Sequence, residues 1–228
     1  MTKTEMESLQ SQLLTWPRYR ELASIVCPTQ LNANYTERLF PLQVGRTMVI
    51  PPELVVVDPK IPTLCQLPYP RTTGESLSCG GTRHHRSACP PYAPTPEQTQ
   101  AKLSQANAVA VIQAENLTDY DHQKQLHYVL LQWEERLKTA GFNIVDSWAA
   151  GPCRICEPEQ ECLGNGKCRQ PKLRRFSMEG SGMAVFATCE RIADLSGDKD
   201  WKLELIENWK LPNQSRNNFK SVVLIAVK

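Results

Sequence analysis

The chain has 228 residues, of which 41% are hydrophobic and 22% are charged, and its net charge is +2. A chain of this size and composition can build its own hydrophobic core, and its near-neutral charge argues against nucleic acid as a partner. The first residues lack the basic and then apolar pattern of a secretory signal, and no apolar run approaches the roughly 20 residues of a membrane helix. We therefore expect a cytoplasmic protein with no membrane or nucleic-acid partner, whose cysteines stay reduced.

The first half of the chain predicts helices separated by a proline-rich stretch. Residues 3–26 predict a helix that Pro17 kinks or splits. Residues 41–70 are rich in proline and include one short strand candidate, ELVVVD at 53–58. TPEQTQAKLSQA at 95–106 predicts the next helix, because a threonine and a proline stand at its expected start.

The second half predicts alternating strands and helices. Residues 108–114 predict a buried strand, 119–140 an amphipathic helix and 142–148 a second strand. This succession is typical of a βαβ unit with parallel strands. Residues 182–195 suit a further helix and 221–227 a final buried strand. The predicted fold class is α/β: a single domain with a small mixed or parallel sheet, flanked by helices, and a cysteine-rich metal loop after a strand.

The nine cysteines are concentrated in the part of the chain beyond residue 50. In a reduced compartment they favour metal binding or thiol chemistry over disulfides. We therefore divide the chain into an N-terminal helical and extended segment, residues 1–50, and a cysteine-rich metal-binding α/β domain, residues 51–228. The densest cluster, GPCRICEPEQECLGNGKC at 151–168, follows a predicted strand, where open α/β sheets place their ligands.

This loop contains four cysteines in the spacing C-x2-C-x5-C-x5-C: Cys153, Cys156, Cys162 and Cys168. A C-x2-C turn can direct two sulfurs at one centre, and its backbone amides can stabilise the thiolates. Structural zinc sites usually pair two such turns across a long spacer, whereas this loop has one. The spacing favours an iron–sulfur cluster, with zinc as the alternative. Reduced structural cysteines, redox thiols or a disulfide pair are the other interpretations.

The residues that follow the loop are basic and then polar. Cations in KCRQPKLRR would favour the reduced state of a cluster or attract an anionic ligand, or they would form a solvated face. We predict Arg175, Ser177 and Glu179 as contacts of the cofactor. Helix capping is the alternative role for Ser177 and Glu179.

A second set of thiols lies upstream, spaced C-x13-C-x9-C: Cys65, Cys79 and Cys89. His84 and His85 fall between the last two cysteines, so three thiols and an imidazole would complete a tetrahedral site. Three thiols alone would hold a cluster with one open iron. Alternatively, at least one of the two histidines is a plain surface residue in a basic loop. We predict that the three thiols lie close together. With Cys189 the two sets supply eight thiols, enough for two four-iron clusters, although a lone helical cysteine is more often a core residue.

Two signatures in the chain resemble a known family. They are CPPYAP at residues 89–94 and GPCRIC at 151–156, the latter continued by CRQP at 168–171 and RFSME at 175–179. Together they resemble the predicted metal-binding proteins grouped as domain of unknown function 2284, over roughly residues 60–228. In that family a CPP segment precedes a GPCxxC loop that leads into R-P-S-M-E; here Phe176 replaces the proline, and CGGTR at 79–83 replaces a Cys-Pro-Asn-Tyr-Gly-like turn. The resemblance implies metal binding without an established reaction.

Two functional hypotheses follow from these patterns. The first is an iron–sulfur (4Fe–4S) protein with one or two clusters and a redox, electron-transfer or accessory role, working with a redox or enzyme partner. The second is a zinc protein in which the cysteine loop is structural and the activity lies elsewhere. No G-x-S-x-G, P-loop or G-x-G-x-x-G motif occurs in the chain, so no enzymatic reaction is assigned.

Overall fold

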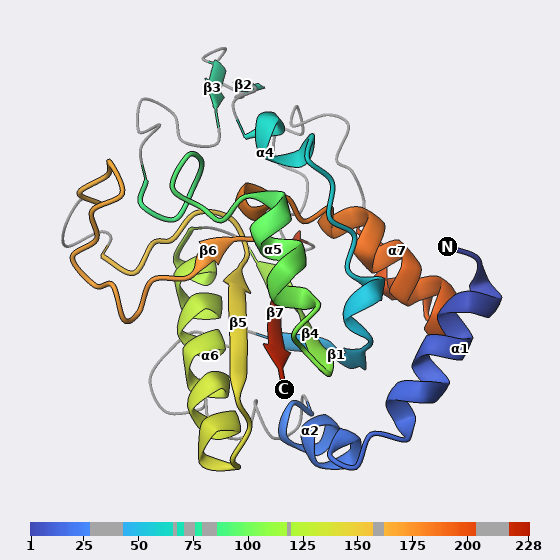
Figure 1. The fold of residues 1–228 in the computed structure, drawn as a ribbon. Helices are drawn as coiled ribbons and strands as arrows, with labels where there is room; N and C mark the ends of the chain where they lie inside the picture. The colour runs from blue at the N-terminus through green and yellow to red at the C-terminus, as the bar shows by residue number, and fades with distance from the viewer. Residues whose placement is uncertain are drawn as a thin grey trace.

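A five-stranded mixed sheet with the strand order β1-β4-β7-β5-β6 forms the centre of the molecule (Figure 1). The structure, a computed structural model, describes residues 1–27, 43–65, 68–70, 76–78, 86–117, 120–156, 162–203 and 219–228. The central strands are β1 (Gln43–Ile50), β4 (Ala108–Leu117), β5 (Ile144–Ala149), β6 (Phe176–Ser177) and β7 (Phe219–Val227). A separate antiparallel pair is formed by β2 (Pro68–Pro70) and β3 (Ser76–Ser78).

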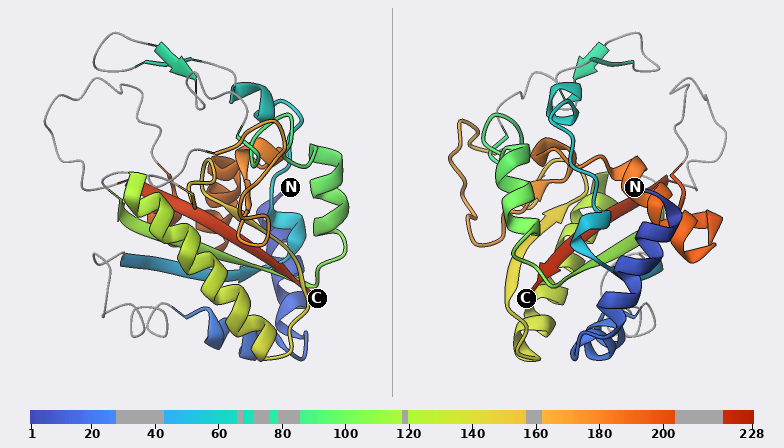
Figure 2. Two further views of the ribbon diagram at one scale, coloured as in Figure 1. Left: turned by 90° about the vertical axis from the view of Figure 1, so that its left-hand side faces the viewer. Right: turned by 45° about the vertical axis from the view of Figure 1, so that its right-hand side comes forward.

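Helices cover both faces of the central sheet (Figure 2). The helices are α1 (Lys3–Leu14), α2 (Tyr19–Ile25), α4 (Ile61–Leu64), α5 (Pro96–Leu103), α6 (Tyr120–Thr139) and α7 (Val185–Ser196). The described residues also form three 3-10 turns: η1 (Pro52–Leu54), η2 (Glu179–Ser181) and η3 (Lys199–Trp201). Residues of α2 and α6 pack on one face, residues of α5 and α7 pack on the other, and α1 contributes to both cores. The predicted α/β class with a mixed sheet is confirmed.

The two middle strands are buried on both faces. In β4, Ile112 faces the core beneath α6, whereas Val111 faces the core beneath α7. In β7, Val223 faces the core beneath α6 and Leu224 faces the core beneath α7. Burial on both faces explains why these strands are continuous apolar runs in the sequence instead of alternating patterns.

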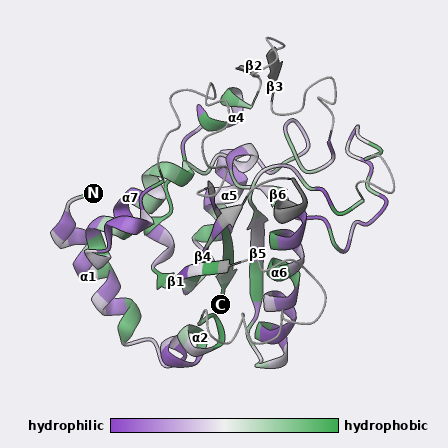
Figure 3. Cartoon of the chain, turned by 180° about the vertical axis from the view of Figure 1, so that it is seen from behind, coloured by the Kyte–Doolittle hydropathy of each residue, from purple (hydrophilic) through white to green (hydrophobic). Residues whose placement is uncertain are grey.

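Helix α6 has the apolar face that the sequence predicts. Its buried residues in the core on this side are Leu126, Val129, Leu130, Trp133 and Leu137. Figure 3 shows hydrophobic and hydrophilic residues alternating around this helix, as expected for a helix with one face on the sheet. The helix is followed by Gly141, whose φ of 77° is readily adopted only by glycine.

The predicted βαβ unit is present, with a third strand inserted into it. Strands β4 and β5 each pair antiparallel with β7, so they run in the same direction without being neighbours. Helix α6 is the crossover between them. The final strand of the sequence therefore lies at the middle of the sheet and joins the two halves of the unit.

The N-terminal helix is split as the sequence predicts. Helix α1 ends at Leu14, α2 begins at Tyr19, and Pro17 lies between them. Proline lacks the amide hydrogen that a continuous helix needs, and its ring clashes with the preceding turn.

The strand predicted at 53–58 is wrong. Residues 52–54 form the turn η1, and Val57 makes only an isolated bridge with Met183. Two prolines precede this stretch and interrupt the ladder of amide donors that a central strand requires. The sheet instead takes its edge strand from β1, which pairs antiparallel with β4. The domain boundary expected after residue 50 stays a prediction.

The cysteine-rich loop leaves the sheet and returns to it at the same edge. Strands β5 and β6 pair in parallel, with Trp148 opposite Phe176 and Ala149 opposite Ser177. The loop 150–175 therefore begins and ends on neighbouring strands, and Figure 1 shows its described parts in yellow and orange at the end of the sheet where α4 also lies. Among the described residues, no helix is both long and apolar enough to cross a membrane.

Candidate metal centre

The four cysteines of the loop line one small cavity of about 20 Å³. Its lining consists of Ser87, Ala88, Cys153, Cys156, Cys162, Leu163, Cys168, Arg169 and Arg174. The thiols also interact electrostatically, since Cys168 disfavours the ionised forms of Cys153 and Cys156. The loop thus brings together the four thiols that the sequence singles out, despite the spacers between them.

Cys153 and Cys156 form the C-x2-C turn of the loop. Burial raises the pKa of the Cys153 thiol, although its sulfur accepts hydrogen bonds from the backbone amides of Ile155 and Arg175. Burial and the neighbouring thiols also raise the pKa of Cys156, against the opposing charges of Arg169 and Lys124. Without a metal both groups therefore favour the neutral thiol, and a bound cation would compensate the charge of the thiolates.

Cys162 has a different environment. Burial alone would raise the pKa of its thiol, but hydrogen bonds from the hydroxyl and amide of Ser87 and the amide of Gly164 lower the pKa overall. The positive charge of Arg86 acts in the same direction. The Ser87 hydroxyl lies 3.5 Å from the Cys162 sulfur and also hydrogen-bonds to the carbonyl of Lys167. The surroundings of Cys162 therefore favour the thiolate, in contrast to those of Cys153 and Cys156.

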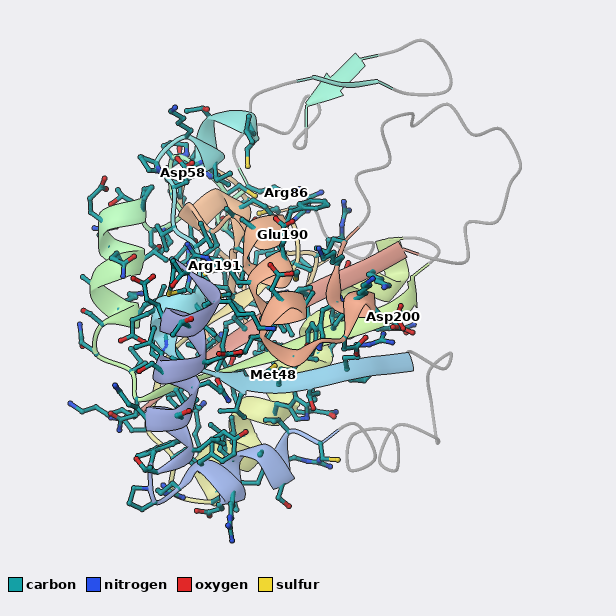
Figure 4. The ribbon with its side chains drawn as sticks, turned by 90° about the vertical axis from the view of Figure 1, so that its right-hand side faces the viewer. Met48, Asp58, Arg86, Glu190, Arg191 and Asp200 are labelled. Carbon is teal, nitrogen blue, oxygen red and sulfur yellow. The ribbon has the colours of Figure 1, made fainter. Side chains whose placement is uncertain are left out.

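The segment that begins with Arg86 packs against the loop and completes the cavity. The guanidinium of Arg86 donates to the carbonyl oxygen of Cys153 at 3.0 Å, and Figure 4 shows this arginine toward the α4 end of the molecule. The amide of Ser177 donates to the Ala88 carbonyl at 3.1 Å. A Cβ atom at Gly166 would lie 3.0 Å from the ring of Tyr92, so the absence of a side chain permits this contact. The two sequence signatures are thus parts of one structural unit.

Arg175 contacts the site through its backbone. Its amide donates to the Cys153 sulfur, whereas its guanidinium forms an ion pair with Glu134 of α6. The Nε–Oε1 distance of this pair is 2.5 Å, and Glu134 also accepts a hydrogen bond from Ser147 of β5 at 2.5 Å. The guanidinium predicted as a cofactor contact is therefore already engaged by α6.

Ser177 and Glu179 lie beside the start of the loop. The Ser177 hydroxyl donates to Glu179 Oε2 at 3.0 Å and accepts from the Gly180 amide at 3.2 Å. Burial raises the pKa of the Glu179 carboxyl, partly opposed by hydrogen bonds that include one from the Gly151 amide. Neither residue caps α7, which begins at Val185. They stabilise the turn η2 and its contact with the loop, and their contact with a cofactor stays a prediction.

The upstream thiols are only partly described. Cys65 ends α4, which lies against η2. Cys89 precedes Pro90, which contacts Gly180 of the same turn. Cys79, His84 and His85 lie outside the described residues, so the predicted closeness of the three thiols stays a prediction.

Cys189 lies in the hydrophobic core. It is fully buried on α7, and burial raises the pKa of its thiol to about 12. Its surroundings contain apolar residues of the core beneath α7. This thiol therefore has the surroundings of a small core residue.

The donor set of the loop suits a thiolate-binding metal or cluster. Four cysteines line one cavity, and backbone amides donate hydrogen bonds to the sulfurs of Cys153 and Cys162, as amides commonly do in cysteine-ligated centres. Within the described part of the chain, no group of three or more His, Cys, Asp or Glu side chains is already arranged to hold a metal ion. Binding therefore requires the loop to adjust around the metal.

The comparisons with known proteins agree with this chemistry. The family model "Predicted metal-binding protein (DUF2284)" matches residues 48–196. The chain belongs to this family. The match in this DUF2284 protein extends from β1 to the end of α7 and includes both signatures and all four thiols of the loop. No curated protein and no solved structure matches the chain.

Several residues around the centre of this DUF2284 protein were not predicted from the sequence. Ser87 and Arg86 contact the loop from a distant segment, and nothing in their local pattern indicates it. The sequence did contain a signal for Glu134 and His127, because both are polar residues next to the apolar face of α6, and both are buried. A charged residue at such a position needs a buried partner, which here is Arg175.

Proposed function

We propose that the loop 150–175 holds an iron–sulfur cluster and that the protein has a redox, electron-transfer or accessory role. The observation that supports this most is the convergence of Cys153, Cys156, Cys162 and Cys168 on one cavity. A bound cluster supplies one-electron transfer, and these four thiolates are its proposed ligands. We also propose that the protein works in the cytoplasm with a redox or enzyme partner, and without nucleic acid or a membrane.

The surroundings of the thiols suit a centre that carries negative charge. Arg169 and Arg174 line the cavity, and Lys124 and Arg86 act electrostatically on thiols of the loop. A four-iron cluster with four thiolates is an anion, and it becomes more negative on reduction. Cations and amide donors near the sulfurs stabilise that state and raise the reduction potential.

Zinc is the alternative occupant. The same four thiolates can surround one Zn²⁺ ion, which would tie the loop together and leave the activity elsewhere. The single C-x2-C turn and the two widely spaced thiols favour the cluster. A second site at Cys65, Cys79 and Cys89 is part of the same proposal and would be the more open of the two.

Visible absorption and metal analysis test the occupant. Protein purified without oxygen should be brown and contain iron and acid-labile sulfide in equal amounts. Colourless protein with one zinc per four-cysteine loop would contradict the cluster and support the alternative. Protein that binds neither iron nor zinc after reconstitution would contradict both.

A further inference from the structure

Two side chains of α6 hold the part of the cysteine loop that returns to the sheet. His127 Nε2 lies 2.9 Å from the carbonyl oxygen of Leu173, and the carboxylate of Glu134 pairs with Arg175. His127 and Glu134 are seven residues apart, so they lie two turns apart on one side of the helix. We refer to these two contacts as the α6 clamp.

The Glu134 contact of the clamp is buried and fully paired. The side chains of Glu134 and Arg175 are 4% and 15% exposed. Both carboxylate oxygens accept from the Arg175 guanidinium, and Oε1 also accepts from Ser147. The guanidinium further donates to the carbonyl oxygens of Lys172 and Arg174 at 3.0 and 2.7 Å. The side chain of Arg175 therefore fixes its own stretch of backbone to α6 and β5.

That stretch of backbone reaches the metal centre. The Arg175 amide donates to the Cys153 sulfur, so the position of this amide depends on where Glu134 holds the side chain. We propose that Glu134 is a positioning residue for the metal centre: through Arg175 it places an amide donor on Cys153. The inference rests on the proposed function, because it requires a metal bound by the loop. In metal-binding proteins, loss of such an outer partner typically lowers metal affinity by about 10–100-fold.

Glu134→Gln is the direct test. Glutamine keeps the size of the side chain and one oxygen for Ser147, but it removes the charge that holds Arg175. Anaerobic titration of the reduced protein with Co²⁺ reports thiolate coordination through its absorption bands. We expect Co²⁺ to bind the variant about 10–100-fold more weakly than the wild type. Amide hydrogen exchange at Arg175 should be faster in the variant even without metal.

The matched control is the ion pair of Arg46 with Glu115, which joins β1 to β4. It is also an arginine–glutamate pair with partly buried side chains, 23% and 24% exposed, and it is reinforced by Asp198 and Asp200. Figure 4 shows Asp200 beside β1, away from Arg86. Arg46→Gln should lower the stability of the fold and leave Co²⁺ affinity and exchange at Arg175 unchanged.

A second variant covers the case in which Glu134→Gln does not fold. In the double variant Glu134→Leu with Arg175→Met, apolar side chains of similar length replace both buried charges, a change that is often neutral for stability. It removes the tie between α6 and the loop, so Co²⁺ affinity should again fall while the fold persists. Wild-type affinity in a folded Glu134 variant, with unchanged exchange at Arg175, would overturn the inference and leave the proposed function intact. Failure of the wild type to bind Co²⁺ through the four thiols would overturn both.

Discussion

The hydroxyl oxygen of Ser87 lies 3.5 Å from the sulfur of Cys162, although 75 residues separate them in the chain. Ser87 belongs to the segment that precedes the CPP signature, and Cys162 belongs to the cysteine loop. This contact joins the two signatures at the cavity. Ser87 is thus a described residue outside the loop whose side chain directly contacts a proposed ligand.

Replacement of Ser87 should weaken metal binding without unfolding the protein. Ser87→Ala removes a hydroxyl donor that favours the thiolate of Cys162, so we expect about tenfold weaker binding of Co²⁺ at neutral pH. Ser104→Ala is the control. Among the bonds described, the Ser104 hydroxyl donates only to the carbonyl oxygen of Ala101, at the exposed end of α5. Equal affinities for the two variants would contradict the role of Ser87.

Loss of the C-x2-C turn should abolish most metal binding. Serine at Cys153 and Cys156 removes two of the four thiolates, and the remaining pair cannot complete a four-thiolate centre. Iron, sulfide and zinc analysis of the purified variant measures the result. Cys189→Ala should keep the metal content of the wild type, because its thiol is buried with a pKa of about 12. Full metal content in the double serine variant would refute the proposed ligands.

The upstream thiols should bind metal separately from the loop. We expect Cys65→Ser with Cys89→Ser to lower the metal content while the spectrum of the loop-bound centre persists. About eight irons per chain in the reconstituted wild type would indicate two four-iron clusters, and about four would leave the upstream thiols empty or zinc-filled. A metal content that the double variant leaves unchanged would show that these thiols bind none.

Protonation of His127 should destabilise the fold in acid. Burial is the main cause that lowers its pKa from 6.5 to about 4, and the carbonyl of Leu173 and the charges of Arg175 and Glu134 modify this effect. In the unfolded chain the imidazole takes up a proton below about pH 6.5, whereas in the folded chain it does so only below about pH 4. The stabilising contribution is therefore complete above pH 6.5 and is lost as the pH falls toward 4, with a total of about 3 kcal/mol.

His127→Gln isolates this effect. Glutamine can still donate to the Leu173 carbonyl but does not titrate. Urea unfolding of the two proteins at pH 7 and pH 4.5, in the same metal state, should show a larger loss of unfolding free energy in the wild type. Identical losses would mean that His127 does not contribute to the acid sensitivity.

The elements set by local sequence were predictable, and those set by distant partners were not. The apolar face of α6 and the split at Pro17 follow from residues within a few helical turns. The grouping of the four thiols of the loop follows from their spacing in the sequence. The edge strand β1 was missed because its pairing with β4 depends on distant residues, from Val109 opposite Ile50 to Glu115 opposite Gln43. ELVVVD has the composition of a strand, yet it follows two prolines and finds only one bridging partner.

The candidate site shows the same contrast between features set by local sequence and features set by distant residues. The four clustered thiols, which are the proposed ligands, were visible as a motif, since cysteine at fixed spacing has few other uses in a reduced protein. Arg175 was singled out as a contact, but its partner Glu134 could not be inferred, because the return of the loop onto α6 is a tertiary contact. Ser87 was not predicted for the same reason. Motifs thus indicate the proposed ligand thiols, and tertiary packing decides which other residues tune those thiols.

The position of β7 has a consequence for the order in which the metal centre can mature. This strand separates β4 from β5, yet the ribosome synthesises it after both of them and after the whole cysteine loop. Until residues 219–227 have emerged, β5 has no partner on that side, and the edge that anchors the loop is incomplete. A metal donor that meets the growing chain therefore finds the four thiols before it finds their scaffold. If the loop binds a metal as proposed, we expect stable insertion only after translation has passed β7.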